Sequence, residues 1–96
     1  MKYGIWVKAE SFDVYEDGSK RRANTNEGWH ADKEYESMKA AKESLATAKE
    51  MLEEDCYDVV AVNTVTLKGV RYSTYNGEPN TPTLHEENIT YHIEKR

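Results

Sequence analysis

The stretch Ser37–Glu54, SMKAAKESLATAKEMLEE, decides the fold of this chain. Its apolar residues are spaced three and four positions apart, and they are Met38, Ala41, Leu45, Ala48 and Leu52. This spacing places them on one stripe of an α-helix. We predict a helix over residues 38–54 with Ser37 as its N-cap, because a serine hydroxyl can accept a hydrogen bond from a free backbone amide. The alternative starts the helix one turn earlier, with Asp32 as the cap.

Segments on both sides of this helix have the two-residue alternation that is typical of β-strands. They are residues 2–8, 12–15, 19–23, 29–36, 57–67, 70–75 and 89–93. Asp17-Gly18 predicts a tight hairpin turn, because glycine adopts the positive φ that such a turn requires. Residues 24–28 and 76–82 have the composition of loops, and Gly69 is expected to mark a turn or bulge. The run 57–67 has valines on both faces, which indicates a central strand.

These elements predict one α+β domain over residues 1–96. We expect an antiparallel β-sheet of four to six strands with one amphipathic α-helix packed on one face. A single helix leaves much of the other face and at least one edge uncovered. Homodimerisation through that face or edge would cover it, so a homo-oligomer is expected.

Composition excludes several classes of protein. Cys56 is the only cysteine, so an internal disulfide and a cysteine-based zinc site are excluded. No run of about 18 apolar residues exists, so no membrane span is expected. The N-terminal residues alternate instead of forming the apolar run of a signal peptide, which favours a cytoplasmic protein.

The net charge of −5 is unevenly distributed. Residues 31–58 carry four basic and nine acidic side chains, whereas the flanking segments are balanced. Glu53, Glu54 and Asp55 lie at the end of the predicted helix, where the helix dipole disfavours negative charge. A basic partner would compensate the negative charge at the helix end. Fraying of the last turn into solvent would also reduce the repulsion. Duplex DNA is not an expected partner, because duplex binding needs a net basic face.

The sequence contains no catalytic motif. His30, His85 and His92 lie on separate segments, and no metal-ligand spacing connects them. The three residues His85-Glu86-Glu87 are interpreted as a polar entry into a strand. We therefore expect no enzyme, no cofactor and no metal site; a small enzyme that uses His30 or His85 is the less favoured hypothesis.

Basic and aromatic residues recur together at two places. The candidate ligand-binding residues are Lys20, Arg21, Arg22, Trp29 and His30 around one predicted loop, and Arg71, Tyr72 and Tyr75 beside another. Arginine can bind phosphate with two hydrogen bonds, and tryptophan or tyrosine can stack on a base. If the two loops meet, they would form a nucleotide pocket. The alternative for each residue is a packing or solubilising role.

Trp29, Tyr35-Glu36-Ser37, the alanine-rich run 38–49 and the valine-rich run 57–65 follow one another in the chain. This order of strand, cap, helix and strand resembles small phage accessory proteins, including anti-CRISPRs and nucleotide-signal sponges. The resemblance implies a phage-encoded counter-defence protein that acts by stoichiometric binding. Its ligand would be a host immune protein or a small nucleotide signal, met in the host cytoplasm. The alternative is a small dimeric adaptor with no immune target.

Overall fold

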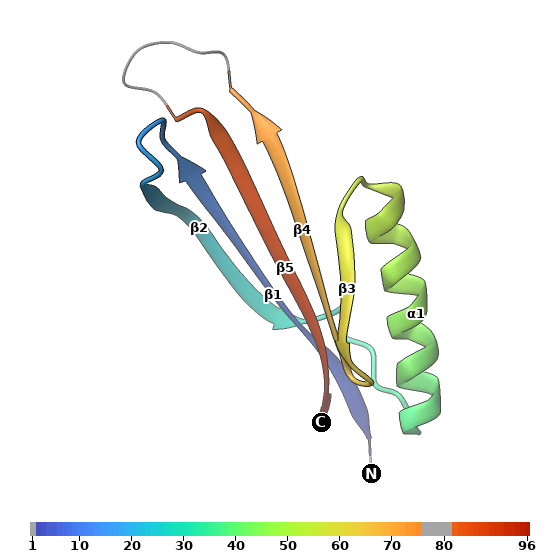
Figure 1. Cartoon of the computed structure of the whole chain (residues 1–96). Helices are drawn as coiled ribbons and strands as arrows, with labels where there is room; N and C mark the ends of the chain where they lie inside the picture. Colours follow the sequence, from blue (N-terminus) through green and yellow to red (C-terminus); the bar gives the residue numbers. More distant parts are fainter. Residues whose placement is uncertain (1, 76–81) are drawn as a thin grey trace.

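The computed structural model describes residues 2–75 and 82–96. One helix, α1 (Met38–Glu54), packs against one antiparallel sheet of five strands, which confirms the predicted α+β fold. The strands are β1 (Tyr3–Val14), β2 (Lys20–Trp29), β3 (Asp58–Asn63), β4 (Thr66–Thr74) and β5 (Leu84–Lys95). Their order across the sheet is β2-β1-β5-β4-β3, so β2 and β3 are the two edge strands (Figure 1).

Helix α1 begins where the sequence predicts. The Ser37 hydroxyl oxygen accepts a hydrogen bond from the backbone N–H of Ala40, at 3.1 Å. The buried residues of the helix are Ala41, Leu45, Ala48 and Leu52. They pack against four buried sheet residues, Ile5, Leu67, Tyr91 and Ile93. We call the side of the sheet that α1 covers the helix face, and the opposite side the open face.

The helix covers only one half of the sheet. Strands β1, β2, β4 and β5 continue past the C-terminal end of α1, as Figure 1 shows, and the molecule measures 53 × 21 × 20 Å. We call this extension the arm and define it as residues 11–24, 71–75 and 83–87. Strands β1, β5 and β4 remain in register through the arm, since Ser11 pairs with Glu87 and Glu87 pairs with Arg71. The pairing of β1 with β2 shifts register between Ser11 and Phe12.

Two of the expected elements near the helix N-terminus are wrong. Residues 24–28 are not a loop but the middle of β2, because pairing with β1 satisfies their backbone groups despite the polar side chains. Residues 29–36 do not form the predicted strand: Trp29 is the last residue of β2, and residues 30–36 are irregular. Ala31 and Asp32 have positive φ values of 54° and 42°, which ends the extended backbone, and only Tyr35 bridges to Tyr3.

The valine-rich run 57–67 is not one central strand. It divides into β3, a turn at Thr64-Val65, and the start of β4, and β3 lies at the sheet edge. Gly69 does not mark a turn either, since it lies inside β4. A side chain there would be 3.3 Å from both Tyr57 and Ile89, so close packing explains this glycine. Of the predicted loop 76–82, residues 76–81 lie outside the described residues.

Candidate functional site on the arm

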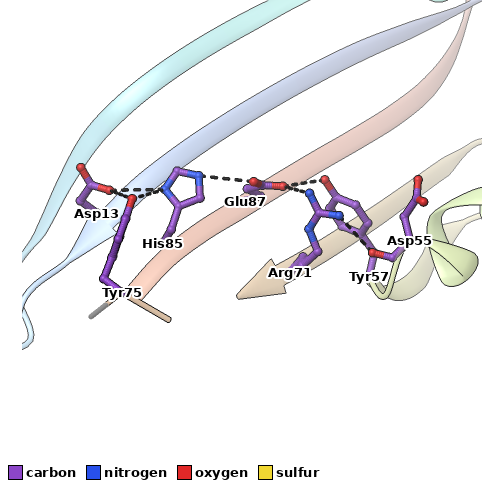
Figure 2. Close-up of polar contacts among 7 residues, drawn as sticks. All are labelled: Asp13, Asp55, Tyr57, Arg71, Tyr75, His85 and Glu87. Carbon is purple, nitrogen blue, oxygen red and sulfur yellow. Dashed lines mark hydrogen bonds and ion pairs between the residues drawn. The ribbon is translucent and has the colours of Figure 1, made fainter. Parts of the chain in front are cut away.

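A row of polar side chains crosses the helix face of the arm, and it starts at the end of α1 (Figure 2). Arg71 on β4 donates a hydrogen bond from Nη1 to the backbone oxygen of Asp55, at 3.1 Å. Its Nη2 forms an ion pair with Glu87 on β5. The guanidinium carbon lies 4.4 Å from the centre of the Tyr57 ring, which is a cation–π distance. Arg71 therefore joins the helix end to two strands.

The row continues from Glu87 to the tip of the arm. Glu87 accepts a hydrogen bond from the Tyr57 hydroxyl at 2.9 Å, and its Oε1 lies 3.4 Å from His85 Nε2. The other ring nitrogen of His85 lies 3.3 Å from Asp13 Oδ1, and Tyr75 donates to the same oxygen at 3.0 Å. Figure 2 shows the two carboxylates on opposite sides of the imidazole ring. Three strands are connected in this way without an apolar core.

The environment of Glu87 keeps this carboxylate ionised. Burial raises its pKa, but hydrogen bonds from Arg71 and Tyr57 outweigh burial, and the net pKa is lowered. Burial raises the pKa of Tyr57, and the hydrogen bond that it donates to Glu87 raises that pKa further. The pair is therefore a carboxylate and a neutral phenol near neutral pH.

A cavity of about 330 Å³ lies beside this row on the helix face. Its lining residues include Ser11, Asn24, Asn26, Tyr57, His85 and Glu87. Hydroxyl, amide and carboxylate groups can hydrogen-bond a small polar molecule. The cavity is a poor site for phosphate, because negative charges repel the anion. The carboxylate of Glu87 lines the cavity, and the carboxylate of Asp13 contacts the ring of His85.

A second polar group lies on the open face of the arm. Glu86 is only 6% exposed, and it accepts hydrogen bonds from Lys20 at 3.2 Å and from Asn88 at 3.0 Å. Burial raises its pKa, while hydrogen bonds from Asn88, Lys20 and Tyr72 lower it, and the lowering prevails. Hydrogen bonding to Glu86 in turn raises the pKa of Tyr72. A lysine and a tyrosine thus cover a buried carboxylate.

Aromatic and charged side chains surround Glu86. The register of the sheet places Arg22, Phe12, Glu86 and Tyr72 side by side on β2, β1, β5 and β4. Arg22 lies over the Phe12 ring and forms an ion pair with Glu10 at 3.2 Å. An open groove of about 450 Å³ runs along this row, and its lining residues are Lys8, Glu10, Phe12, Lys20, Lys68, Val70, Tyr72, Glu86, Asn88 and Thr90.

The eight residues predicted to bind a ligand do not form one pocket in a single chain. Lys20, Arg22 and Tyr72 meet on the open face of the arm, whereas Arg71 and Tyr75 belong to the row on the helix face. Arg21 pairs in register with Asp13, on the helix-face side of β2. Trp29 and His30 lie at the other end of β2, about 30 Å away at about 3.3 Å per residue.

Trp29 and His30 have packing partners at that end of the sheet. The Trp29 ring meets the Trp6 ring edge to face, with centroids 5.1 Å apart, and Arg96 lies over it at 4.8 Å. His30 contacts the ring of Tyr91 in the same edge-to-face manner, at 5.5 Å. The condition for a nucleotide pocket, that the two basic and aromatic loops converge, is not met within one chain.

Sequence reasoning missed the residues that connect the arm. His85 and Glu87 lie two positions apart within β5, so strand periodicity places them on one face, with Glu86 on the other. That signal was present: His85-Glu86-Glu87 are the second to fourth residues of β5, so they lie at the polar entry of this strand as predicted, but the sequence did not show that they have partners across the sheet. Their partners Asp13 and Tyr57 come from distant segments, and no local pattern identifies them.

Residues 2–75 and 82–96 contain no group of three or more His, Cys, Asp or Glu side chains that is arranged to hold a metal ion. Within the same ranges, α1 is too short and too polar to cross a membrane.

Comparison with known proteins provides no relative. The chain matches no protein-family model, no curated protein sequence and no solved structure.

Proposed function

We propose that this chain is a non-catalytic binding protein that acts by stoichiometric occupancy, in the manner of a phage counter-defence inhibitor. A host immune protein is the proposed partner, and the open face of the sheet is the proposed contact surface. The observation that carries this proposal is the groove around Glu86, where the strand register arranges aromatic and charged side chains on the face opposite α1, which is the only helix in the described part of the chain.

The shape of this surface favours a protein partner. Small-molecule sites are concave and bury most of the ligand, whereas stable protein interfaces are broad and bury about 800 Å² on each partner. The groove is open, and it lies on the sheet of a molecule that is 53 Å long in its longest dimension. Tyr72 is 57% exposed on it, and tyrosine and arginine are common among residues that dominate binding energy.

The charges on the open face also favour a protein over a nucleotide. Lys8 and Arg22 both pair with Glu10, and Lys20 pairs with Glu86. A phosphate group would have to compete with these carboxylates for Lys8, Lys20 and Arg22. Lys68 is the one groove cation that has no ion pair among residues 2–75 and 82–96. The open face therefore has positive and negative side chains next to each other. A protein partner with the opposite arrangement of charges could pair with them, which would make binding specific.

Rigidity supports binding by occupancy. The row from Asp55 to Asp13 and the contacts of Glu86 hold the strands of the arm before any partner arrives. A preorganised surface loses less conformational entropy on association, so more of the contact energy appears as affinity.

The proposal is tested by expressing the chain in bacteria that carry one defined immune system each, and by measuring phage plaque formation. We expect plaques to return with the system whose protein is bound. Titration of the purified immune protein should then show inhibition that saturates at a fixed molar ratio. Light scattering after size exclusion should give a complex of the same stoichiometry.

Variants locate the contact surface. Tyr72→Ala and Lys68→Glu should each weaken the complex at least tenfold with little change in melting temperature. Glu50→Lys, on the exposed side of α1, is the matched control and should bind as the wild type does. Loss of binding in the control alone would refute the open face as the contact surface. Inhibition that continues far below one chain per target, or a thermal shift with nucleotides and no protein complex, would refute the proposal itself.

A further inference from the structure

The two free edges of the sheet differ in how well they are protected against further strand pairing. Strand β2 begins with three exposed basic residues, Lys20, Arg21 and Arg22, which discourage pairing with another chain. Strand β3 has the sequence DVVAVN. Within this strand, Asp58 is the only charged residue and there is no proline. Among residues 2–75 and 82–96, β3 pairs with β4 only, so the backbone groups on its other side have no strand partner there.

The side chains of β3 are also unusually exposed for apolar residues. Val60 is 62% exposed and Val62 is 58% exposed, and Ala61 between them is exposed as well. A valine-rich strand at a free edge, with no charged residue after Asp58, is a template for antiparallel pairing. Strand β3 has one irregularity, a register shift against β4 between Ala61 and Asn63. Within the described residues, no strand covers the outer side of β3 and no charged residue after Asp58 blocks it.

We infer that β3 is a self-association edge, and that a second copy of this chain pairs with it in antiparallel orientation to form one continuous ten-stranded sheet. The inference is independent of the proposed function, because it concerns an edge and not the groove of the open face.

The sequence of β3 is complementary to itself in this arrangement. When the two-fold axis passes beside Ala61, each Val60 lies opposite Val62 of the second copy, so four exposed valines are covered together. Asp58 then falls opposite residue 64, so that the two aspartates do not face each other. A shift of the axis by one residue places Val60 opposite its own copy and still keeps the aspartates apart. Self-pairing of β2 would bring no comparable apolar contact.

The first test is the mass of the full chain in solution as a function of concentration. Sedimentation equilibrium should show a rise from the monomer mass of 11.1 kDa toward twice that value. The double variant Val60→Lys, Val62→Lys should raise the dissociation constant of the dimer at least tenfold. Asn26→Lys, an exposed substitution on β2, is the matched control and should leave the dissociation constant unchanged. Circular dichroism and the melting temperature verify that each variant is folded.

A second test reports on the geometry. In a Cys56→Ser background, mild oxidation of Ala61→Cys, or of Val60→Cys for the shifted register, should give a disulfide-linked dimer, because residues on the two-fold axis of an antiparallel pair have Cα atoms about 5 Å apart. Asn26→Cys should remain monomeric under the same oxidation. A wild-type chain that is monomeric up to millimolar concentration would overturn the inference. So would a dimer that survives the double lysine substitution, or one that is cross-linked through Asn26→Cys.

Discussion

Arg71 on β4 donates a hydrogen bond to the backbone oxygen of Asp55, the C-cap of α1, across 3.1 Å. The helix ends in Glu53, Glu54 and Asp55, and its dipole makes further negative charge there unfavourable. Arg71 supplies the positive charge that compensates it, and through Glu87 it connects the helix end to the arm.

Arg71 is consequently expected to be a stability residue. Arg71→Ala removes the hydrogen bond to the Asp55 carbonyl, the ion pair with Glu87 and the cation–π contact with Tyr57. It should lower the free energy of unfolding by about 1–3 kcal/mol. Arg71→Lys keeps the charge without the planar fork and should recover part of the loss. Urea unfolding measures both. Arg21→Ala, at an exposed position of β2, is the control and should change stability by less than about 0.5 kcal/mol. An equal loss in the control would contradict the role assigned to Arg71.

Cys56 occupies a position that suits glycine. It follows the C-cap with a φ of 65°, its N–H donates to Glu53 at 3.1 Å, and the N–H of Tyr57 donates to Leu52 at 3.0 Å, which is a Schellman motif. Cys56→Gly should remove the left-handed strain and raise the free energy of unfolding by about 1 kcal/mol. Thermal unfolding provides the measurement. Cys56→Ser keeps a side chain at this φ, so stabilisation by serine as well would show that the thiol, and not the backbone, was responsible.

Gly4 and Gly28 should respond oppositely to the same substitution. A Cβ at Gly4 would lie 2.8 Å from the ring of Trp29, whereas a Cβ at Gly28 would have nothing within 4 Å. Gly4→Ala should displace Trp29 and destabilise the protein by about 1–2 kcal/mol, as overpacking does. Gly28→Ala should be neutral or slightly stabilising, because alanine costs less entropy in a strand. Melting temperature and tryptophan fluorescence report the two effects, and equal destabilisation by both would refute this packing argument.

Acid should weaken the arm through Glu86 and Glu87. Both carboxylates have pKa values lowered from the ordinary 4.5, so folding favours their ionised forms. Their contribution to stability is complete above the pKa of the unfolded chain and is lost as the pH falls through the lower folded value. The free energy of unfolding should therefore decrease between about pH 5 and pH 3.

Glutamine variants identify the groups responsible for this pH dependence. Glu86→Gln and Glu87→Gln should each be less stable than the wild type at pH 7 and should show a flatter decrease toward pH 3. Glu50→Gln, at an exposed position of α1, should keep the wild-type slope. Urea unfolding at a series of pH values makes the comparison, and an unchanged slope in both variants would rule out these carboxylates as the origin.

The local elements could be predicted from the sequence because their signals are local. Helix α1 and its Ser37 cap depend on side-chain spacing and on one hydrogen bond within four residues. The polar stretch 24–28 looks like a loop by composition, yet it is a strand, since backbone pairing with β1 does not require apolar side chains. The valine-rich run looks central by composition, yet β3 is an edge, because β5 returns from the C-terminal end of the chain to lie between β1 and β4.

The candidate site was also predictable only in its local part. Sequence patterns identified Lys20, Arg22 and Tyr72 as a basic and aromatic set, but only the register across four strands brings them around Glu86. The helix, its buried stripe and the α+β class can be read from local patterns, because they follow from periodicities of 3.6 and two residues. The strand order, the half-covered arm and its polar rows depend on contacts between distant segments. Strand pairing joins Tyr3 to Lys95, and the polar rows join Asp13 to His85, so no local preference encodes these contacts.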